Sequence, residues 1–435
     1  MSNSRPTFEK KEMAISATPY VYFPADVKFL TYAVEITHED EVDADLLQKA
    51  LDRTIARMPY LADTFQIEGG AVYYATNPLP MEVGRGQGLR HVGGHETNYH
   101  MLDVTCEGKV TRFAMFHGFC DGQGLNMFLE SVLYHYYCIR DGVEYDPCGI
   151  RTNASTMTEA EYMEPLSVTR EVSPDFQMPQ KKDQAAAFHL PEISRYPGND
   201  VRDWGLMVSS EDLMKFVKEN GTSPSVAISM FMAEAVAATH PNNDAPIVAN
   251  VPISVRRMLG CNETFKNCSS RIVLPLTGTP LDALPFDQRA AQLRGILKMQ
   301  MANPDIWNST YNMLRSVYGK RMEATDYWEE TKKPSSFASV GHDTFYIDYI
   351  GRMRQMEYAN KIVDVRFVCK PAAGNTLHVN VIDHAGKFRI DCLACSDITK
   401  IVDALVQAFA DHGLTVERRP EVRFELPETA WREGV

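Results

Sequence analysis

The sequence has no long apolar run and no apolar segment near its start. No stretch approaches the roughly 18 consecutive apolar residues of a membrane-spanning helix. Residues 1–12 are polar and mixed in charge, so a secretory signal with an apolar core is not expected. These absences predict a cytoplasmic protein without a membrane span.

Basic charge is also scarce. The chain has 44 Lys and Arg against 57 Asp and Glu, a formal net charge of -13. Broad binding of nucleic acid or of an anionic membrane needs a basic surface, so neither partner is expected. A few local Arg and Lys residues would still suffice to bind one phosphate-bearing small molecule.

The cysteines form neither a disulfide framework nor a metal set. Their number is odd, nine, and their spacing does not repeat, which is typical of free thiols in a reducing compartment. Cys392 and Cys395 form one CxxC pair, but no second pair or histidine tract completes a zinc set. Because residues 388–395 alternate like a strand, we interpret this pair as strand packing rather than as a redox or zinc site.

What is present is a globular composition of two-domain size. The chain is 44% hydrophobic and 23% charged, and its 435 residues exceed one core of ordinary size. Periodicity fades from about residue 141 to 203, where six prolines interrupt it. We expect an N-terminal subdomain of residues 1–170, a crossover linker of residues 171–203 and a C-terminal subdomain of residues 204–435.

Strands and helices alternate in both halves. In the first half, a helix opens at Asp43, and a hairpin of residues 99–117 precedes a second helix after Gly122. In the second half, we expect strands at 204–208, 246–255, 271–276, 343–350, 362–369, 375–383 and 387–394, with helices between them. This pattern predicts an α/β fold of two mixed sheets, each covered by helices, with an active site where the halves meet.

The most informative segment is residues 116–122, Phe-His-Gly-Phe-Cys-Asp-Gly. It places His117 where a packed strand gives way to a packed, amphipathic helix. An imidazole is the side chain best suited to take up a proton near neutral pH. His117 is therefore our candidate general base.

Four motifs, in order, resemble the chloramphenicol acetyltransferase-like superfamily of HxxxD acyltransferases. That superfamily includes BAHD transferases, alcohol acyltransferases and the condensation domains of nonribosomal peptide synthetases. The HxxxDG hallmark corresponds to His117, Asp121 and Gly122. The other similar stretches are an "rhP.L" segment at residues 57–61, a "VP…R" segment at 251–256 and a "Y-x-G" segment at 349–351. Together they span most of the chain.

The resemblance does not single out one branch of the superfamily. Many condensation domains have two adjacent histidines, whereas Phe116 fills the first of these places here. BAHD enzymes carry a DFGWG motif. Residues 348–352, Asp-Tyr-Ile-Gly-Arg, resemble it only loosely.

The resemblance implies how the motif residues act. It implies two chloramphenicol acetyltransferase-like subdomains around His117 and direct acyl transfer without a covalent acyl-enzyme. It also implies that Asp121 turns away from the histidine and pairs with Arg256, so that both residues, with Gly122, shape the loop. The alternative is that Asp121 and Arg256 are two separate surface charges.

Three further residues are candidates for the substrate site: Gly124, Asn267 and Tyr349. Gly124 either lets a backbone N–H approach an oxyanion or only forms a turn. Asn267 lies where the family often has a polar residue facing the site, although we favour a solvated loop asparagine. Cys120, beside the motif, is interpreted as a buried thiol because nothing pairs it with a base.

We therefore expect an acyltransferase that moves an acyl group from a thioester to a hydroxyl or amine acceptor. The donor thioester would be acyl-coenzyme A or carrier-bound phosphopantetheine, and the acidic total favours coenzyme A. No tightly bound cofactor or metal is expected, and a monomer would suffice. Candidates for contact with the donor's phosphates are Arg256, Arg257, Lys266, Arg271, Lys332 and Lys333. The alternatives are a freestanding condensation-type catalyst that forms amides and a non-catalytic member that binds an acyl ligand or a partner.

Overall fold

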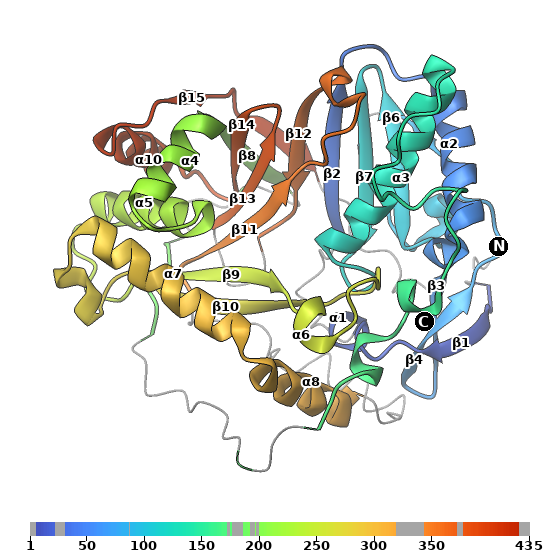
Figure 1. Cartoon of the computed structure of the whole chain (residues 1–435), viewed down its shortest axis with the longest axis horizontal. Helices are drawn as coiled ribbons and strands as arrows, with labels where there is room; N and C mark the ends of the chain where they lie inside the picture. Colours follow the sequence, from blue (N-terminus) through green and yellow to red (C-terminus); the bar gives the residue numbers. More distant parts are fainter. Residues whose placement is uncertain are drawn as a thin grey trace.

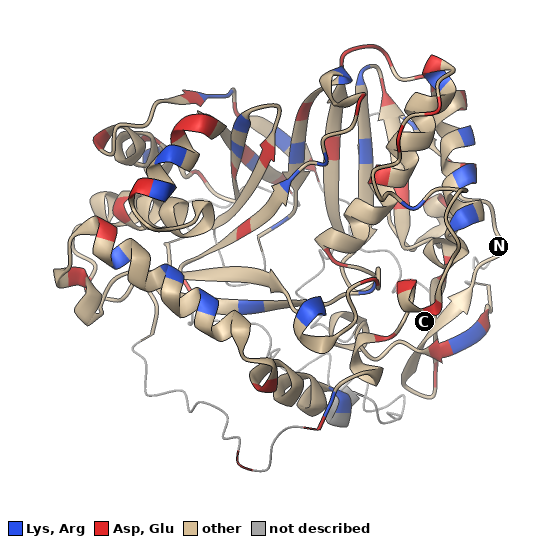
Figure 2. Cartoon of the chain, viewed as in Figure 1, with Lys and Arg blue, Asp and Glu red and all other residues tan. Residues whose placement is uncertain are grey.

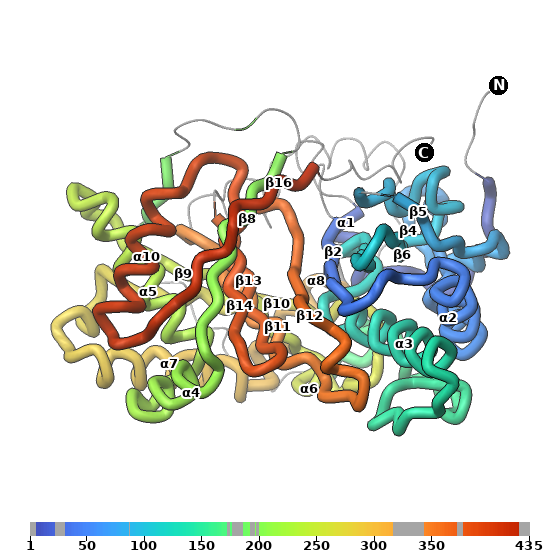
Figure 3. The backbone as a smooth tube through the Cα atoms, turned by 90° about the horizontal axis from the view of Figure 1, so that it is seen from above, coloured from blue at the N-terminus to red at the C-terminus, as the bar shows by residue number. Residues whose placement is uncertain are grey.

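Two apolar cores hold the chain together in the computed structural model. One lies on a five-stranded and a three-stranded sheet, the other on an eight-stranded sheet. The structure describes residues 6–21, 31–86, 88–171, 175, 186–191, 196, 200–318, 343–371 and 377–425. Figures 1 and 3 show these sheets with their helices as two lobes lying side by side. We call them the N-terminal and C-terminal lobes.

The N-terminal lobe contains a five-stranded sheet in the order β12-β2-β7-β6-β5 and a three-stranded sheet in the order β1-β4-β3. The strands are β1 (Glu9–Met13), β2 (Thr31–His38), β3 (Thr64–Glu68), β4 (Ala71–Thr76), β5 (Gly84–Arg85), β6 (Leu102–Glu107), β7 (Val110–Phe116) and β12 (Ile362–Val368). The helices are α1 (Thr18–Val21), α2 (Ala44–Arg57) and α3 (Gly122–Asp141).

The C-terminal lobe is built on an eight-stranded sheet in the order β10-β9-β11-β13-β14-β8-β15, with β16 also paired to β8. The strands are β8 (Asp200–Ser209), β9 (Val248–Ser254), β10 (Ser269–Pro275), β11 (Phe345–Arg352), β13 (Leu377–His384), β14 (Lys387–Ala394), β15 (Val416–Arg418) and β16 (Val422–Glu425). The helices are α4 (Ser210–Glu219), α5 (Pro224–Thr239), α6 (Arg256–Leu259), α7 (Phe286–Ala302), α8 (Pro304–Tyr318) and α10 (Thr399–Asp411).

The sequence explains where the main helices begin. Asp43 caps α2 by accepting hydrogen bonds from the backbone N–H groups of Asp45 and Leu46. Ser223 and Pro224 open α5, with proline at the first helical position, where no N–H is needed. Helix α5 is apolar and buried on almost every side because it packs against both α10 and α7. The predicted α/β fold of mixed sheets covered by helices is confirmed.

Strand β12 belongs by sequence to the second half but pairs with β2 of the N-terminal lobe. The register is antiparallel and runs from Ile362 opposite His38 to Val368 opposite Ala33. Strand β8 begins at Asp200, inside the range predicted as a linker. The predicted boundaries at residues 170 and 203 stay a prediction. Strand β12 falls in the predicted C-terminal subdomain by sequence but belongs to the sheet of the N-terminal lobe.

A buried ionic network joins the two sheets beside β12. Glu35 of β2 accepts hydrogen bonds from Arg112 (2.8 Å) and from Arg366 of β12 (2.6 Å). Asp203 of β8 lies 3.6 Å from Arg366 and 3.4 Å from Arg389. Figure 2 shows charges of both signs on these strands between the lobes. Because buried charges need partners, this network fixes the lobes relative to one another.

Candidate active site

His117 lies in the tight turn between β7 and α3. The Phe119 N–H donates to the Phe116 carbonyl (2.8 Å), which closes the turn. A Cβ atom at Gly118 would lie 2.4 Å from the Phe116 ring, so only glycine fits at that position. The turn holds His117 half-buried at the junction of the lobes, rather than sealed in a core.

The imidazole of His117 has one nitrogen engaged and one without a partner among the described residues. Its Nδ1 lies 3.3 Å from the Cys120 carbonyl, which can only accept, and 3.4 Å from Nδ2 of Asn267, which can only donate. The shorter contact assigns the proton to Nδ1, since Nδ2 of Asn267 already donates to the His117 carbonyl. No described residue hydrogen-bonds to Nε2, which therefore presents a lone pair. The rings of Tyr20 and Tyr32 pack against the imidazole, with centroids 4.9 and 4.4 Å away. Burial lowers the pKa of His117, and the Cys120 carbonyl and Asp121 offset this shift only in part.

Asn267 reaches His117 from the C-terminal lobe, from the segment that leads into β10. Its Nδ2 donates to the His117 carbonyl (2.5 Å), and its Oδ1 accepts from the Ser269 backbone N–H (2.9 Å). The residue is only 4% exposed. The interpretation of Asn267 as a solvated loop residue is therefore wrong, because both ends of its amide are bonded within the fold.

Asp121 and Arg256 form a buried, two-pronged ion pair between the lobes. Nη1 and Nη2 of Arg256 lie 2.6 and 2.7 Å from the two carboxylate oxygens of Asp121. Asp121 also caps α3 through the Gly124 N–H (3.1 Å) and accepts from the Cys268 N–H (2.9 Å). The carboxylate thus turns away from the imidazole, and the alternative of two separate surface charges is wrong.

The ion pair is satisfied on every side. Arg256 donates further to the carbonyls of Thr264 (2.9 Å) and Lys266 (2.8 Å). Burial alone raises the pKa of Asp121, but Arg256 and the backbone N–H groups outweigh it and bring the pKa below its ordinary value. Asp121 therefore stays ionised and shapes the loop, and it is not placed to act as a proton carrier.

The two motif glycines differ in what surrounds them. A Cβ atom at Gly124 would lie 2.0 Å from the Phe265 carbonyl oxygen and 2.7 Å from Cβ of Cys120, whereas at Gly122 nothing lies within 4 Å. The close backbone approach of the two lobes thus accounts for Gly124. The chain itself does not require glycine at position 122 for space.

Gly124→Ala is therefore expected to destabilise the fold by about 1–3 kcal/mol, the usual cost of overpacking. Gly122→Ala, its matched control, should stay within about 1 kcal/mol of the parent because alanine favours the helix. Urea unfolding measures both. An equal loss in the two variants would contradict the packing account.

Tyr349 does not contact His117. It lies on β11, is 37% exposed, and its ring centroid lies 6.2 Å from that of Phe388 in the C-terminal core. Side chains alternate along a strand, so Tyr349 shares a face with Ile347, while Tyr346 and Asp348 occupy the other face. Tyr349 thus lies on the side of β11 that carries Ile347, and its placement in the substrate site stays a prediction.

The basic residues and thiols near the site are mostly engaged. Arg256 is paired with Asp121, and Lys266, almost fully buried, pairs with Glu12 at 2.5 Å. Neither is available to a donor's phosphates, which corrects that prediction, and Lys332 and Lys333 lie outside the described residues. Cys120 is fully buried, as predicted, and burial raises the pKa of its thiol.

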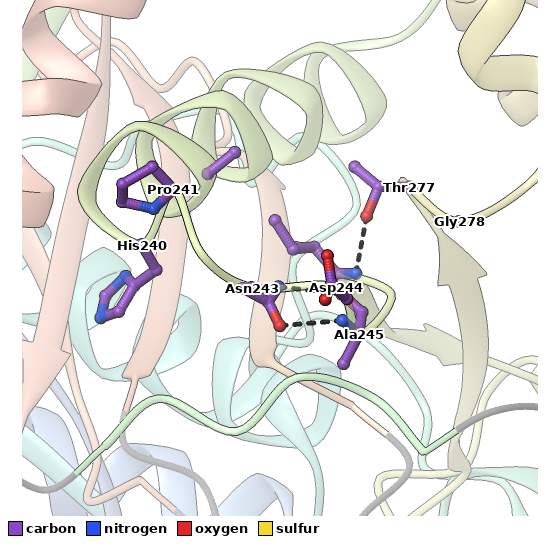
Figure 4. A pocket seen from close by; sticks show the side chains of 9 residues that line it. His240, Pro241, Asn243, Asp244, Ala245, Thr277 and Gly278 are labelled. Atoms are coloured by element: carbon purple, nitrogen blue, oxygen red, sulfur yellow. Dashed lines mark hydrogen bonds between the residues drawn. The ribbon is translucent and has the colours of Figure 1, made fainter.

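A shallow hollow of about 250 Å³ follows α5 and is unrelated to this site (Figure 4). Its polar groups hydrogen-bond to one another. The Asn243 side chain donates to the Ala245 carbonyl and accepts from the Ala245 N–H, and the Ile247 N–H donates to the Thr277 hydroxyl (2.8 Å). The hollow lies at the start of β9, whereas Arg256 follows its end. A strand of seven residues at roughly 3.3 Å each separates them by about 20 Å.

Two further observations concern the described residues as a whole. Within the described ranges, no group of three or more His, Cys, Asp and Glu side chains is arranged to hold a metal ion. None of the helices in these ranges combines the length and the apolar character needed to cross a bilayer.

Comparison with known proteins places the fold. No family model and no curated protein matches the sequence. Among solved structures, the chain resembles polyketide synthase associated protein 5 from Mycobacterium tuberculosis (TM-score 0.63, 15% identity, covering 93% of this chain and 98% of that chain). It also resembles TRI101 of F. sporotrichioides, solved with coenzyme A and T-2 (TM-score 0.60, 11% identity, covering 91% and 98%).

A third similar structure is the first condensation domain of the calcium-dependent antibiotic synthetase, in complex with a substrate analogue (TM-score 0.60, 13% identity, covering 93% and 96%). The likeness extends over nearly the whole length of each protein. The chain therefore has the two-lobed fold shared by chloramphenicol acetyltransferase-like acyltransferases and condensation domains.

Proposed function

We propose that this protein is an acyltransferase that moves an acyl group from a thioester to a hydroxyl or amine, with His117 as general base. The observation that carries the proposal is the half-buried imidazole between the lobes. Its Nδ1 faces the Cys120 carbonyl, and no described residue pairs with its Nε2. A base needs such a free nitrogen within reach of the proton that it removes.

The proposed reaction requires no covalent enzyme intermediate. The acceptor oxygen or nitrogen forms a bond to the thioester carbonyl carbon while its proton passes to Nε2 of His117. The C–S bond then breaks, and the proton passes from Nε2 to the departing thiolate. Cys120, buried and raised in pKa, takes no part as a nucleophile.

We propose acyl-coenzyme A as the donor, with carrier-bound phosphopantetheine as the alternative. The acidic net charge of -13 favours it over a carrier protein of like charge. TRI101, a structural neighbour, was solved with coenzyme A. The test is release of free thiol from a panel of acyl-coenzyme A donors with generic alcohols and amines. If acyl-coenzyme A donors release thiol only at the background rate while carrier-bound thioesters release it faster, the condensation-type alternative is favoured. If neither kind of donor releases thiol, the remaining alternative is a non-catalytic protein that binds an acyl ligand or a partner.

The pH dependence follows from the lowered pKa of His117. A general base works when unprotonated, so kcat/KM falls as the pH drops through the pKa of His117 in the folded protein. Because burial lowers that pKa, the acid limb should have its midpoint below the ordinary histidine value of about 6.5. A pH–rate profile measures it. A midpoint clearly above 6.5 would contradict the assignment.

A further inference from the structure

Three polar side chains on neighbouring strands of the C-terminal sheet have side-chain atoms without a hydrogen-bond partner among the described residues. Asp348 lies on β11, and His378 and Asn380 lie on β13. The two strands are parallel, with Tyr346 opposite His378 and Asp348 opposite Asn380. The Tyr346 ring stacks on His378, with centroids 5.5 Å apart. The four residues therefore form one patch, which we call the polar wall.

The polar wall faces the N-terminal lobe. Alternate residues of the same strands, Phe345, Ile347 and Val379, belong to the C-terminal core under the helices, so the polar residues occupy the other face. On that face, Asn380 donates from Nδ2 to the Phe367 carbonyl of β12 (3.3 Å).

Packing connects the polar wall to the candidate base. Asn380 donates to the Phe367 carbonyl, the Phe367 ring lies 6.0 Å from that of Tyr32, and the Tyr32 ring lies 4.4 Å from the imidazole of His117. Burial lowers the pKa of His378 to about 4, with a contribution from His117. Asp348 adds to the effect of burial in raising the pKa of Tyr32, whose ring lies 4.4 Å from the imidazole of His117. Both shifts agree with this packing.

The wall has hydrogen-bonding capacity that the described protein leaves unused. His378 and Asn380 are 4% and 1% exposed, yet Nε2 of His378 and Oδ1 of Asn380 have no hydrogen-bond partner in the described part of the chain. Asp348 is half-buried, and its carboxylate forms no hydrogen bond or ion pair with a described residue. An unpaired buried polar group costs about 1–3 kcal/mol, so three at adjoining positions are expected where a ligand pairs with them.

The carboxylate of Asp348 indicates that such a ligand carries a positive charge. The nearby arginine, Arg256, is already paired with Asp121. Burial and the charge of Asp121 raise the pKa of Asp348 to about 7. A positively charged group beside it would favour the ionised carboxylate, as arginine does elsewhere in this fold.

We propose that Asp348, His378 and Asn380 form the acceptor subsite, and that the acceptor carries a basic nitrogen bound by Asp348. The assignment of this ligand as the acceptor rests on the proposed function. The carboxylate and Oδ1 of Asn380 accept from the ligand's N–H or O–H groups. Asp348 thereby sets specificity, while His117 remains the base.

Equilibrium binding tests the subsite without turnover. Benzylamine, protonated at neutral pH, and benzyl alcohol are a matched pair of probes, titrated into the full chain by ligand-observed NMR. The parent should bind benzylamine about tenfold more tightly than benzyl alcohol, since a charge-assisted hydrogen bond distinguishes the two. Asp348→Asn should abolish that preference, and Asp287→Asn, at an exposed position in α7, should keep it. Equal binding of both probes by the parent, or an unchanged preference in Asp348→Asn, overturns the proposal.

Stability separates a subsite from a structural role. Because Asp348 has no hydrogen-bond or ion-pair partner among the described residues, Asp348→Asn should unfold at the same or a higher urea concentration than the parent. A marked loss of stability would assign Asp348 to the fold instead. If the probes bind as expected but no thioester is consumed, the proposed function fails and the amine-binding site stands. If thiol is released but the amine preference is missing, only the subsite fails.

Discussion

His117→Ala is expected to lower kcat for acyl transfer by about 10²–10⁴-fold, the usual contribution of general-base assistance. The fold should survive, because Asn267 bonds the backbone carbonyl of His117, which alanine keeps. Thiol release measures the rate, and urea unfolding checks that the variant is folded.

A matched histidine variant controls for nonspecific effects. His95 is exposed in the N-terminal lobe, where its ring lies edge-on to Tyr99. His95→Ala should therefore retain the parent's rate. If His117→Ala releases thiol as fast as the parent, His117 is not the base and the proposed mechanism fails.

Arg256→Met is expected to lower the free energy of unfolding by about 3–5 kcal/mol, because it leaves the Asp121 carboxylate buried and uncompensated. The carbonyls of Thr264 and Lys266 lose their donor as well. Activity should fall in parallel, since Asp121 caps α3 next to the His117 turn. Urea unfolding and thiol release measure the two losses.

A double-mutant cycle separates the ion pair from the packing around it. Asn can still cap a helix, so Asp121→Asn combined with Arg256→Met removes the lone charge and should recover part of the loss. The exposed pair of Arg418 and Asp403, with side chains 41% and 55% exposed, is the control. Arg418→Met should cost only about 0–1 kcal/mol. Equal losses in Arg256→Met and Arg418→Met would mean that the buried pair does not hold the lobes.

Local chemistry made much of the fold predictable. Asp43 and Pro59 delimit α2, and the Asp121 cap begins α3, because caps and prolines act within a few residues. The resemblance added the pairing of Asp121 with Arg256, which the structure contains. Neither residue alone indicates the other, since 135 positions separate them.

Long-range placement was not predictable in the same way. A strand near residues 362–369 was predicted, but its pattern does not say which sheet edge it joins. Asn267 was interpreted as a solvated loop residue, whereas packing against the other lobe buries it. The signal in the sequence for the proposed subsite is the set of polar residues on one face of two strands: Tyr346 and Asp348 on β11, and His378 and Asn380 on β13.

The position of β12 has a consequence for biosynthesis. A ribosome releases β2 long before Ile362–Val368, so the nascent first half carries an open sheet edge during most of translation. The five-stranded sheet can be completed only after residues 362–368 have been synthesised. Truncation products ending before residue 362 should therefore aggregate or recruit chaperones.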